Sequence, residues 1–270
     1  MENIKHILVP TDFSPNATKA LDHAVQIARQ TQSSILLLHV VESNELLETT
    51  EANSEKMELI KKSIQQTGPV VINTKLIRGL AIDSILDTIS ADEIDLVIMG
   101  TVGNAGFSEK IFGSKTAKII STSPIPVLAI PLLSEWGTHP DILLAINDFN
   151  VDDKKLNPVI QLARLLNSNL QVAIFTDTDD DYVEDYEVHE QQIASFRDAL
   201  KIKYPDLAIN AVHLASRHFM DSLLNWIDKN KIGMLVMLTH KRNIIESIFN
   251  QSLTRKMSYH TNIPLLAIPV

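Results

Sequence analysis

The stretch KHILVPTDFSPNATKALDHAVQIARQTQSSILLLHVV, residues 5–41, contains the clearest signals of the fold. It begins with the apolar run KHILVP (5–10) and ends with SILLLHVV (34–41), and such continuous apolar runs are typical of strands buried on both faces. Between them the apolar residues of ATKALDHAVQIARQ recur at helical spacing, and Ser14 followed by Pro15 predicts a helix start. A strand, a helix and a second strand in this order predict a parallel sheet with a right-handed crossover.

Three more apolar runs follow in the first half of the chain. They are VVINTKLI (70–77), DLVIMG (95–100) and IPVLAIP (125–131), and amphipathic segments with a period near 3.6 separate them. The first half therefore predicts one α/β domain, residues 1–131, with a doubly wound sheet of five parallel strands and helices on both faces.

The second half of the chain repeats this pattern. IPVLAIP (125–131) and IPLLAIP (263–269) agree at six of seven positions, and ILVPTDF (7–13) corresponds to ILLAINDF (142–149). We interpret this as a tandem duplication, in which LLSEWGTHP (132–140) links the first domain to a second one, residues 141–270. The strands of the second domain are expected near residues 141–146, 169–175, 207–213, 233–238 and 264–268.

Composition excludes several classes of function. The chain has 270 residues, a formal net charge of −9 and no cysteine, so we expect no duplex nucleic acid partner, disulfide or thiolate metal site. The N-terminus lacks the long apolar region of a signal peptide. The longest apolar run, IPVLAIPLL (125–133), has nine residues where a membrane span needs roughly 20, so we expect no membrane association and a cytoplasmic location.

The segment GTVGNAGFSEKIFGS (100–114) is unusual because it contains four of the eight glycines of the chain. Gly100 ends a predicted strand, and ligands of parallel sheets bind beyond the carboxyl ends of the strands. Glycine accepts positive φ and permits close approach of a ligand, and Gly113-Ser114 precedes a predicted helix whose first N–H groups are unpaired. The segment therefore predicts a phosphate site, although it matches neither the P-loop nor the dinucleotide fingerprint.

The spacing Gly100-x2-Gly103-x9-Gly113-Ser114 resembles the ATP-binding motif G-x2-G-x9-G-[ST] of universal stress proteins. ILVPTDFS, LLLHVVE, LVIMG and SPIPVLAIP extend the resemblance, which covers the whole chain and includes the tandem arrangement that is common in this family. It implies the strand order 3-2-1-4-5 of the adenine nucleotide alpha-hydrolase-like fold in each domain.

The resemblance also implies a nucleotide site in the first domain. Pro10, Thr11 and Asp12 are expected to border the nucleoside, with the Asp12 carboxylate near the ribose hydroxyl groups, and Val40 is expected to contact adenine. Met99 and Gly100 are expected to line the floor of the pocket. The implied phosphate ligands are Gly103, Gly113, Ser114 and the backbone amide of Lys115. Mg²⁺ or Mn²⁺ is expected to bridge the phosphates, and the choice between ATP, ADP and AMP stays open.

The second domain lacks this motif. LTHKRNIIESIFNQS (238–252) aligns with the glycine segment and contains no glycine, and Leu238 falls opposite Gly100. A side chain there occupies the space that a ligand needs, and residues other than glycine resist positive φ. We therefore expect one nucleotide per chain, bound in the first domain only.

The expected function is an ATP-binding regulatory or signalling module of the stress response. No general base stands near the predicted phosphates, so no residue is assigned a catalytic role and turnover is expected to be slow or absent. Two alternatives stay open. One is an ATP-hydrolysing or adenylyl-transferring enzyme, although PTDFSPN (10–16) lacks the SGGxDS loop of the transferring enzymes. The other is a nucleotide-free interaction scaffold.

Partners and minor motifs complete the expectations. The two last strands, IPVLAIP and IPLLAIP, are expected to pair within the chain as a pseudo-dimer, and homodimers of whole chains are compatible with this. The acidic run TDTDDDYVEDYEVHE (176–190) lacks the glycine and the last glutamate of a calcium-binding EF-hand loop. It is interpreted as a solvated loop that leads into a helix.

Overall fold

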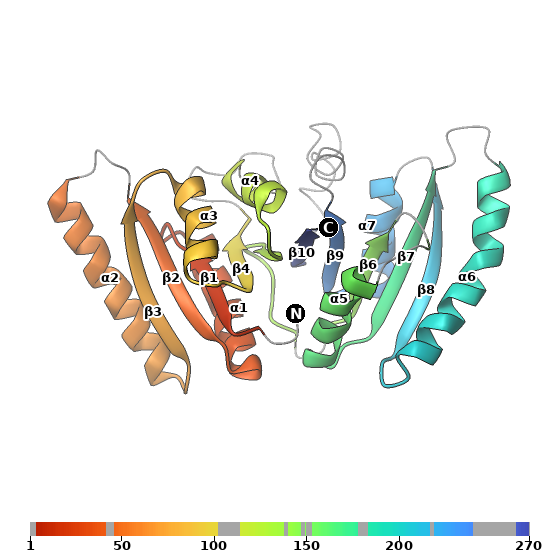
Figure 1. The fold of residues 1–270 in the computed structure, drawn as a ribbon, viewed down its shortest axis with the longest axis horizontal. Coiled ribbons are helices and arrows are strands. Elements are labelled where there is room, and N and C mark those ends of the chain that lie inside the picture. The colour runs from red at the N-terminus through yellow and green to blue at the C-terminus, as the bar shows by residue number, and fades with distance from the viewer. Residues whose placement is uncertain are drawn as a thin grey trace. The chain divides into compact units, whose positions relative to one another are not determined.

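The computed structural model describes residues 4–41, 46–101, 114–137, 140–146, 149, 153–177, 183–216, 219–239 and 263–269. The chain divides into two compact units, and it passes from the first to the second between Ser134 and Glu135. Figure 1 shows the helices and strands of both units, which are described one at a time.

The first unit alternates strands and helices, as the sequence predicts. Its described elements are β1 (His6–Pro10), α1 (Pro15–Thr31), β2 (Ser34–Val41), α2 (Leu47–Gln66), β3 (Val71–Arg78), α3 (Ala81–Ala91), β4 (Leu96–Gly100), α4 (Ser114–Thr122) and β5 (Val127–Ile130). The strands lie in the order β3-β2-β1-β4-β5, and neighbouring strands are parallel. The predicted α/β class with a parallel sheet is confirmed.

Most of these strands are buried, which explains their apolar sequences. Ile7, Leu8 and Val9 of β1 are fully buried, and all four residues of β5 are buried as well. The interpretation of every apolar run as a strand covered on both faces is wrong for β3, where Val71 is 62% exposed. The reason is the position of β3, which lies next to β2 at the end of the strand order. A strand at the edge of a sheet has a neighbouring strand on one side only and is less covered than a central strand.

The first helix begins where the sequence predicts. Ser14 is the N-cap, its hydroxyl oxygen accepts a hydrogen bond from the Ala17 amide over 3.2 Å, and Pro15 is the first helical residue. Gln32, in the left-handed conformation with φ 57°, caps the other end. α1 packs against β1, β2, β4 and β5, whereas α3 contacts α4 and lies in front of the strands in Figure 1.

The second unit has the same alternation. Its described elements are β6 (Ile142–Ile146), α5 (Asp153–Leu165), β7 (Leu170–Asp177), α6 (Val183–Lys203), β8 (Ile209–Ser216), α7 (Phe219–Asn230), β9 (Met234–Thr239) and β10 (Leu265–Pro269). The strands lie in the order β10-β9-β6-β7-β8, and β6 pairs in parallel with β7 and β9, as β7 does with β8. These strands lie within a few residues of the predicted runs.

Candidate functional site

The topology of the first unit indicates at which edge of its sheet a ligand would bind. The chain moves from β1 to β2 and β3 in one direction, and β4 and β5 lie on the other side of β1. The strand order therefore reverses between β1 and β4, and a crevice at the carboxyl ends of two such strands is where open α/β sheets bind ligands. Pro10 and Gly100, the last residues of β1 and β4, lie at this edge.

The start of α4 is fixed at the same edge. The Thr116 hydroxyl group donates a hydrogen bond to the carbonyl oxygen of Gly100 over 2.8 Å, and the Thr116 side chain is buried. Ser114 and Lys115, the first two residues of α4, are exposed. N–H groups in the first turn of a helix have no partner within the helix, and they lie at the positive end of the helix dipole. This arrangement suits an anion such as a phosphate group.

Gly100 has a structural reason of its own to be glycine. A Cβ atom added at this position would lie 2.8 Å from the backbone carbon and oxygen of Asn16, in the first turn of α1. The backbone of Gly100 does not adopt the left-handed conformation, so positive φ is not the reason for glycine at this position. The close packing of α1 on the end of β4 requires glycine here, with or without a ligand.

The turn between β1 and α1 contains the predicted residues Thr11 and Asp12. The Thr11 amide donates to the Leu38 carbonyl oxygen over 2.8 Å, and its hydroxyl oxygen accepts from the Phe13 amide over 3.0 Å. One oxygen of the exposed Asp12 carboxylate accepts from the Ser14 amide over 3.0 Å. The turn is therefore held by its own side chains, and Asp12 lies at its surface.

The other predicted residues of this edge differ in exposure. Pro10 and Val40 are partly exposed at the ends of β1 and β2 and offer apolar surface. Met99 is only 7% exposed, so its side chain belongs mainly to the core. Gly103 and Gly113 lie outside the described residues, as does most of the segment that aligns with them in the second unit.

Sequence reasoning missed a polar and aromatic cluster behind the turn. His39 of β2 is 9% exposed and contacts the Thr11 carbonyl oxygen through Nδ1 at 2.8 Å and Asn53 of α2 through Nε2 at 3.1 Å. The ring of Phe13 packs against the His39 imidazole with 4.5 Å between centroids, and the Lys56 ammonium group lies 4.3 Å from the centroid of the Phe13 ring. In the sequence, the only indication of this cluster is the position of His39 near the end of a predicted strand.

The described parts of both units contain neither a metal cluster nor a membrane span. No three histidine, aspartate or glutamate side chains gather there as a ready-made metal site. Within the same residues, no helix is both long and apolar enough to cross a bilayer. The acidic run of the second unit leads into α6 as predicted, and Asp179 and Asp181 lie outside the described residues.

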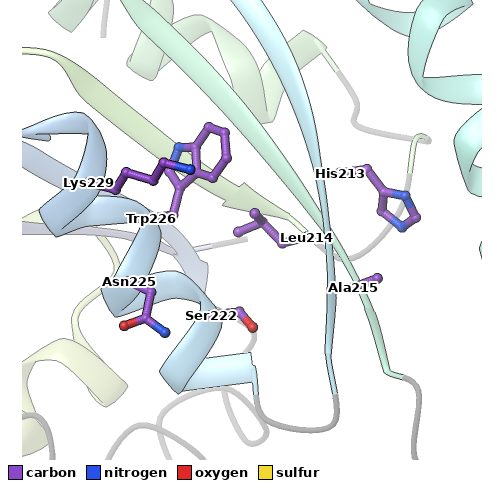
Figure 2. A pocket seen from close by; sticks show the side chains of 7 residues that line it. All are labelled: His213, Leu214, Ala215, Ser222, Asn225, Trp226 and Lys229. Atoms are coloured by element: carbon purple, nitrogen blue, oxygen red, sulfur yellow. The ribbon is translucent and has the colours of Figure 1, made fainter.

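A pocket of about 290 Å³ lies in the second unit between β8 and α7. Figure 2 shows Leu214 directed from β8 toward Trp226 of α7, whereas His213 points away from that helix. His213 contacts Glu190 of α6 instead, with 2.7 Å between Nδ1 and Oε1. The pocket is open, and none of the described residues that line it has a carboxylate. The lining residues are His213, Leu214, Ala215, Ser222, Asn225, Trp226 and Lys229.

Comparison with known proteins agrees with the architecture. Residues 3–131 match the universal stress protein family. Universal stress protein Sll1654 from Synechocystis is 33% identical over 137 residues, which are 47% of this chain and 85% of that protein. Universal stress protein Slr1230 from the same organism is 24% identical over 97% of this chain and 99% of its own length.

A solved structure supports the same fold. The crystal structure of a universal stress protein from Archaeoglobus fulgidus superimposes with a TM-score of 0.72 and 16% identity, and it covers 99% of this chain and 97% of that one. At this identity the likeness concerns the fold alone. Together with the sequence match to Sll1654, these findings show that the chain belongs to the universal stress protein family.

Proposed function

We propose that this chain is an ATP-binding regulatory protein of the stress response, which holds one adenine nucleotide at the carboxyl edge of β1 and β4. The observation that supports this most directly is the hydrogen bond between Thr116 and Gly100. It fixes the start of α4 near the point where strand order reverses, and the amides in the first turn of a helix, which have no partner within the helix, suit a phosphate at the edge where such sheets bind nucleotides.

The residues present fit an adenine nucleotide. Pro10 and Val40 supply partly exposed apolar surface for the base, and the exposed carboxylate of Asp12 suits the ribose hydroxyl groups. The Ser114 hydroxyl group and the Lys115 amide suit the phosphates, together with the amides of Gly103 and Gly113. The floor beneath them consists of Met99 and Gly100.

A divalent cation fits the site only when it is bound to the phosphates of the nucleotide. No cluster of three acidic or histidine side chains occurs among the described residues. Mg²⁺ commonly keeps several waters and is held through one or two carboxylates and the phosphate oxygens of its nucleotide. We therefore propose that Mg²⁺ or Mn²⁺ enters with the nucleotide, where it neutralises phosphate charge.

We further propose that the chain consists of two tandem domains, residues 1–131 and 141–270, each with a doubly wound five-stranded sheet, joined by residues 132–140. The match of Slr1230 along 97% of the chain favours the tandem interpretation. The absence of glycine from 238–252 favours a second domain that binds no ATP. The lack of cysteine is compatible with the cytoplasm as the place of action.

The decisive experiment measures thermal stability with and without nucleotide. ATP with Mg²⁺ at about 100 times the Kd is expected to raise the Tm by about 5–10 °C. The Gly113→Asp variant places a carboxylate among the phosphate-binding amides and is expected to lose this shift. Gly137→Asp, the same substitution in the linker, is the control and is expected to keep it.

Further ligands and products separate the alternatives. The panel includes ADP, AMP and cAMP, the last being the ligand with which another universal stress protein was crystallised. Steady-state release of phosphate or pyrophosphate from ATP would favour an enzyme. An unchanged Tm with every adenine nucleotide would contradict the proposed function and favour a nucleotide-free scaffold.

A further inference from the structure

His39 is hydrogen-bonded through both of its ring nitrogens. Nδ1 lies 2.8 Å from the carbonyl oxygen of Thr11, which only accepts hydrogen bonds, so Nδ1 has the proton and donates it. Nε2 lies 3.1 Å from the amide nitrogen of Asn53, which donates, so Nε2 accepts. The pair of contacts selects the neutral Nδ1–H form of the imidazole and links α2 through β2 to the β1–α1 turn.

The turn needs such support because Phe13 adopts the left-handed conformation, with φ 60°. This conformation is unfavourable for a bulky side chain and persists only where the surroundings fix it. The Phe13 ring packs on the His39 imidazole with 4.5 Å between centroids, and the Lys56 ammonium group lies 4.3 Å from the ring centroid. Two residues of α2, Asn53 and Lys56, therefore help to hold the turn that contains Thr11 and Asp12.

The residues that correspond to Phe13 and His39 in the second unit have other neighbours. His6 pairs with Ser34 at the start of the β1–β2 register, and Ile142 pairs with Leu170 at the start of the β6–β7 register. When these two pairs are aligned, Phe149 corresponds to Phe13 and Phe175 corresponds to His39. Phe149 packs edge-on against Phe196 of α6 with 5.4 Å between ring centroids. Phenylalanine at 175 has no nitrogen with which to hold a carbonyl oxygen. The polar link thus belongs to the unit in which the nucleotide motif is intact.

We infer that His39, backed by Asn53, is a positioning residue of the nucleotide site. By holding the Thr11 carbonyl oxygen it sets the orientation of the Thr11–Asp12 backbone, and with it the direction in which the Asp12 carboxylate meets the nucleoside. This inference rests on the proposed function. It adds a role for a residue behind the site, which touches the turn and not the nucleotide.

Two variants of the full chain test it. His39→Phe copies the second unit: it keeps an aromatic ring against Phe13 and removes the donor to Thr11. His39→Asn places an amide nitrogen close to the position of Nδ1 and keeps that donor. Calorimetric titration with Mg²⁺-ATP is expected to show about tenfold weaker binding for His39→Phe, the loss of one buried hydrogen bond, and near-normal binding for His39→Asn.

A control variant and further measurements distinguish a loss of positioning from a general loss of stability as the cause of weaker binding. His6→Phe makes the same change at the opposite end of the sheet, where His6 is exposed, and is expected to bind as the original chain does. ¹⁵N-NMR of the imidazole is expected to show a protonated Nδ1 and a bare Nε2 at position 39. The Tm of each variant without nucleotide shows whether weaker binding merely follows weaker folding.

The outcomes are distinct. If the original chain binds ATP and His39→Phe binds equally well, the inference is wrong while the proposed function stands. Equal weakening in His39→Phe and His39→Asn, in proportion to their lower Tm, also overturns it, because the donor to Thr11 would then not matter. If the original chain binds no adenine nucleotide, the proposed function fails first and the inference fails with it.

Discussion

The Ser134 hydroxyl group lies 3.2 Å from Nε2 of His23, and both side chains are almost fully buried. Nδ1 of the same ring lies 3.0 Å from the Lys19 carbonyl oxygen one turn earlier in α1. Since that oxygen accepts, Nδ1 donates and Nε2 accepts from Ser134 in the neutral ring. The contact ties the segment that follows β5 to the first helix of the same unit.

This contact predicts how stability depends on pH. Burial lowers the pKa of His23 below its ordinary value of 6.5, and the hydrogen bond to the Lys19 carbonyl opposes this only in part. The unfolded chain therefore binds the proton more readily than the folded chain. The contribution of His23 to stability is complete above pH 6.5 and is lost as the pH falls through the folded-state pKa.

Urea unfolding at a series of pH values between 7.5 and 5 measures this effect. The free energy of unfolding is expected to fall with pH less steeply in His23→Asn than in the original chain, whatever the variant loses at pH 7.5. Identical slopes for the two proteins would mean that His23 does not contribute to the acid sensitivity of the first unit.

The Thr116–Gly100 hydrogen bond predicts a stability loss without any nucleotide. Thr116→Val keeps the shape of the side chain but removes its only donor, which leaves the Gly100 carbonyl oxygen short of a partner. The expected cost is about 1–3 kcal/mol in the free energy of unfolding, measured by urea titration. Thr122→Val, which removes a hydroxyl group from the exposed end of the same helix, should change it by no more than about 0.5 kcal/mol.

The packing of Gly100 gives a prediction that separates structure from ligand binding. Gly100→Ala forces α1 away from the end of β4, because the new methyl group would stand 2.8 Å from the Asn16 backbone. We expect a loss of about 1–3 kcal/mol in the free energy of unfolding of the ligand-free chain. Gly137→Ala is the matched control, since the nearest atom to its Cβ is 3.9 Å away. A normal ligand-free stability for Gly100→Ala, with weakened nucleotide binding, would contradict the packing explanation.

The strands and the first helix could be predicted because their signals are local. Continuous burial makes β1 and β5 readable as apolar runs, and the cap of α1 depends on Ser14 and its immediate neighbours. β3 is the exception, because its place at the end of the strand order depends on the whole topology and not on its own residues.

The parts of the candidate site that sequence reasoning missed depend on contacts between distant segments. Asn53 reaches His39 only because α2 packs beside β2, and Asn16 meets Gly100 only because α1 crosses the end of β4. The sequence shows a glycine at 100 and a histidine at 39 but not the neighbours that explain them. For Gly100 the sequence allowed either positive φ or close approach of a ligand, whereas the structure shows close approach of the α1 backbone.

The difference between the two halves predicts the stoichiometry of binding. Leu238, which aligns with Gly100 in the sequence, is buried near the end of β9, and the aligned segment 238–252 contains no glycine. We expect about one adenine nucleotide per chain when the purified protein is denatured and its nucleotides are measured by chromatography. Two nucleotides per chain would contradict the expectation of a second domain without ATP.

The last prediction concerns the chemistry of the phosphate contacts. If backbone amides at the start of α4 hold the phosphates, the Lys115 ammonium group contributes only long-range attraction, because that side chain is exposed and salt screens it. Lys115→Ala is then expected to weaken Mg²⁺-ATP binding by less than about threefold at 150 mM salt, a fraction of one hydrogen bond. Lys118→Ala, a further exposed lysine of α4, is the control for charge alone. A loss of about 30-fold or more for Lys115→Ala, with Lys118→Ala unchanged, would identify the lysine side chain as a direct phosphate ligand and remove the basis for a site built from main-chain groups.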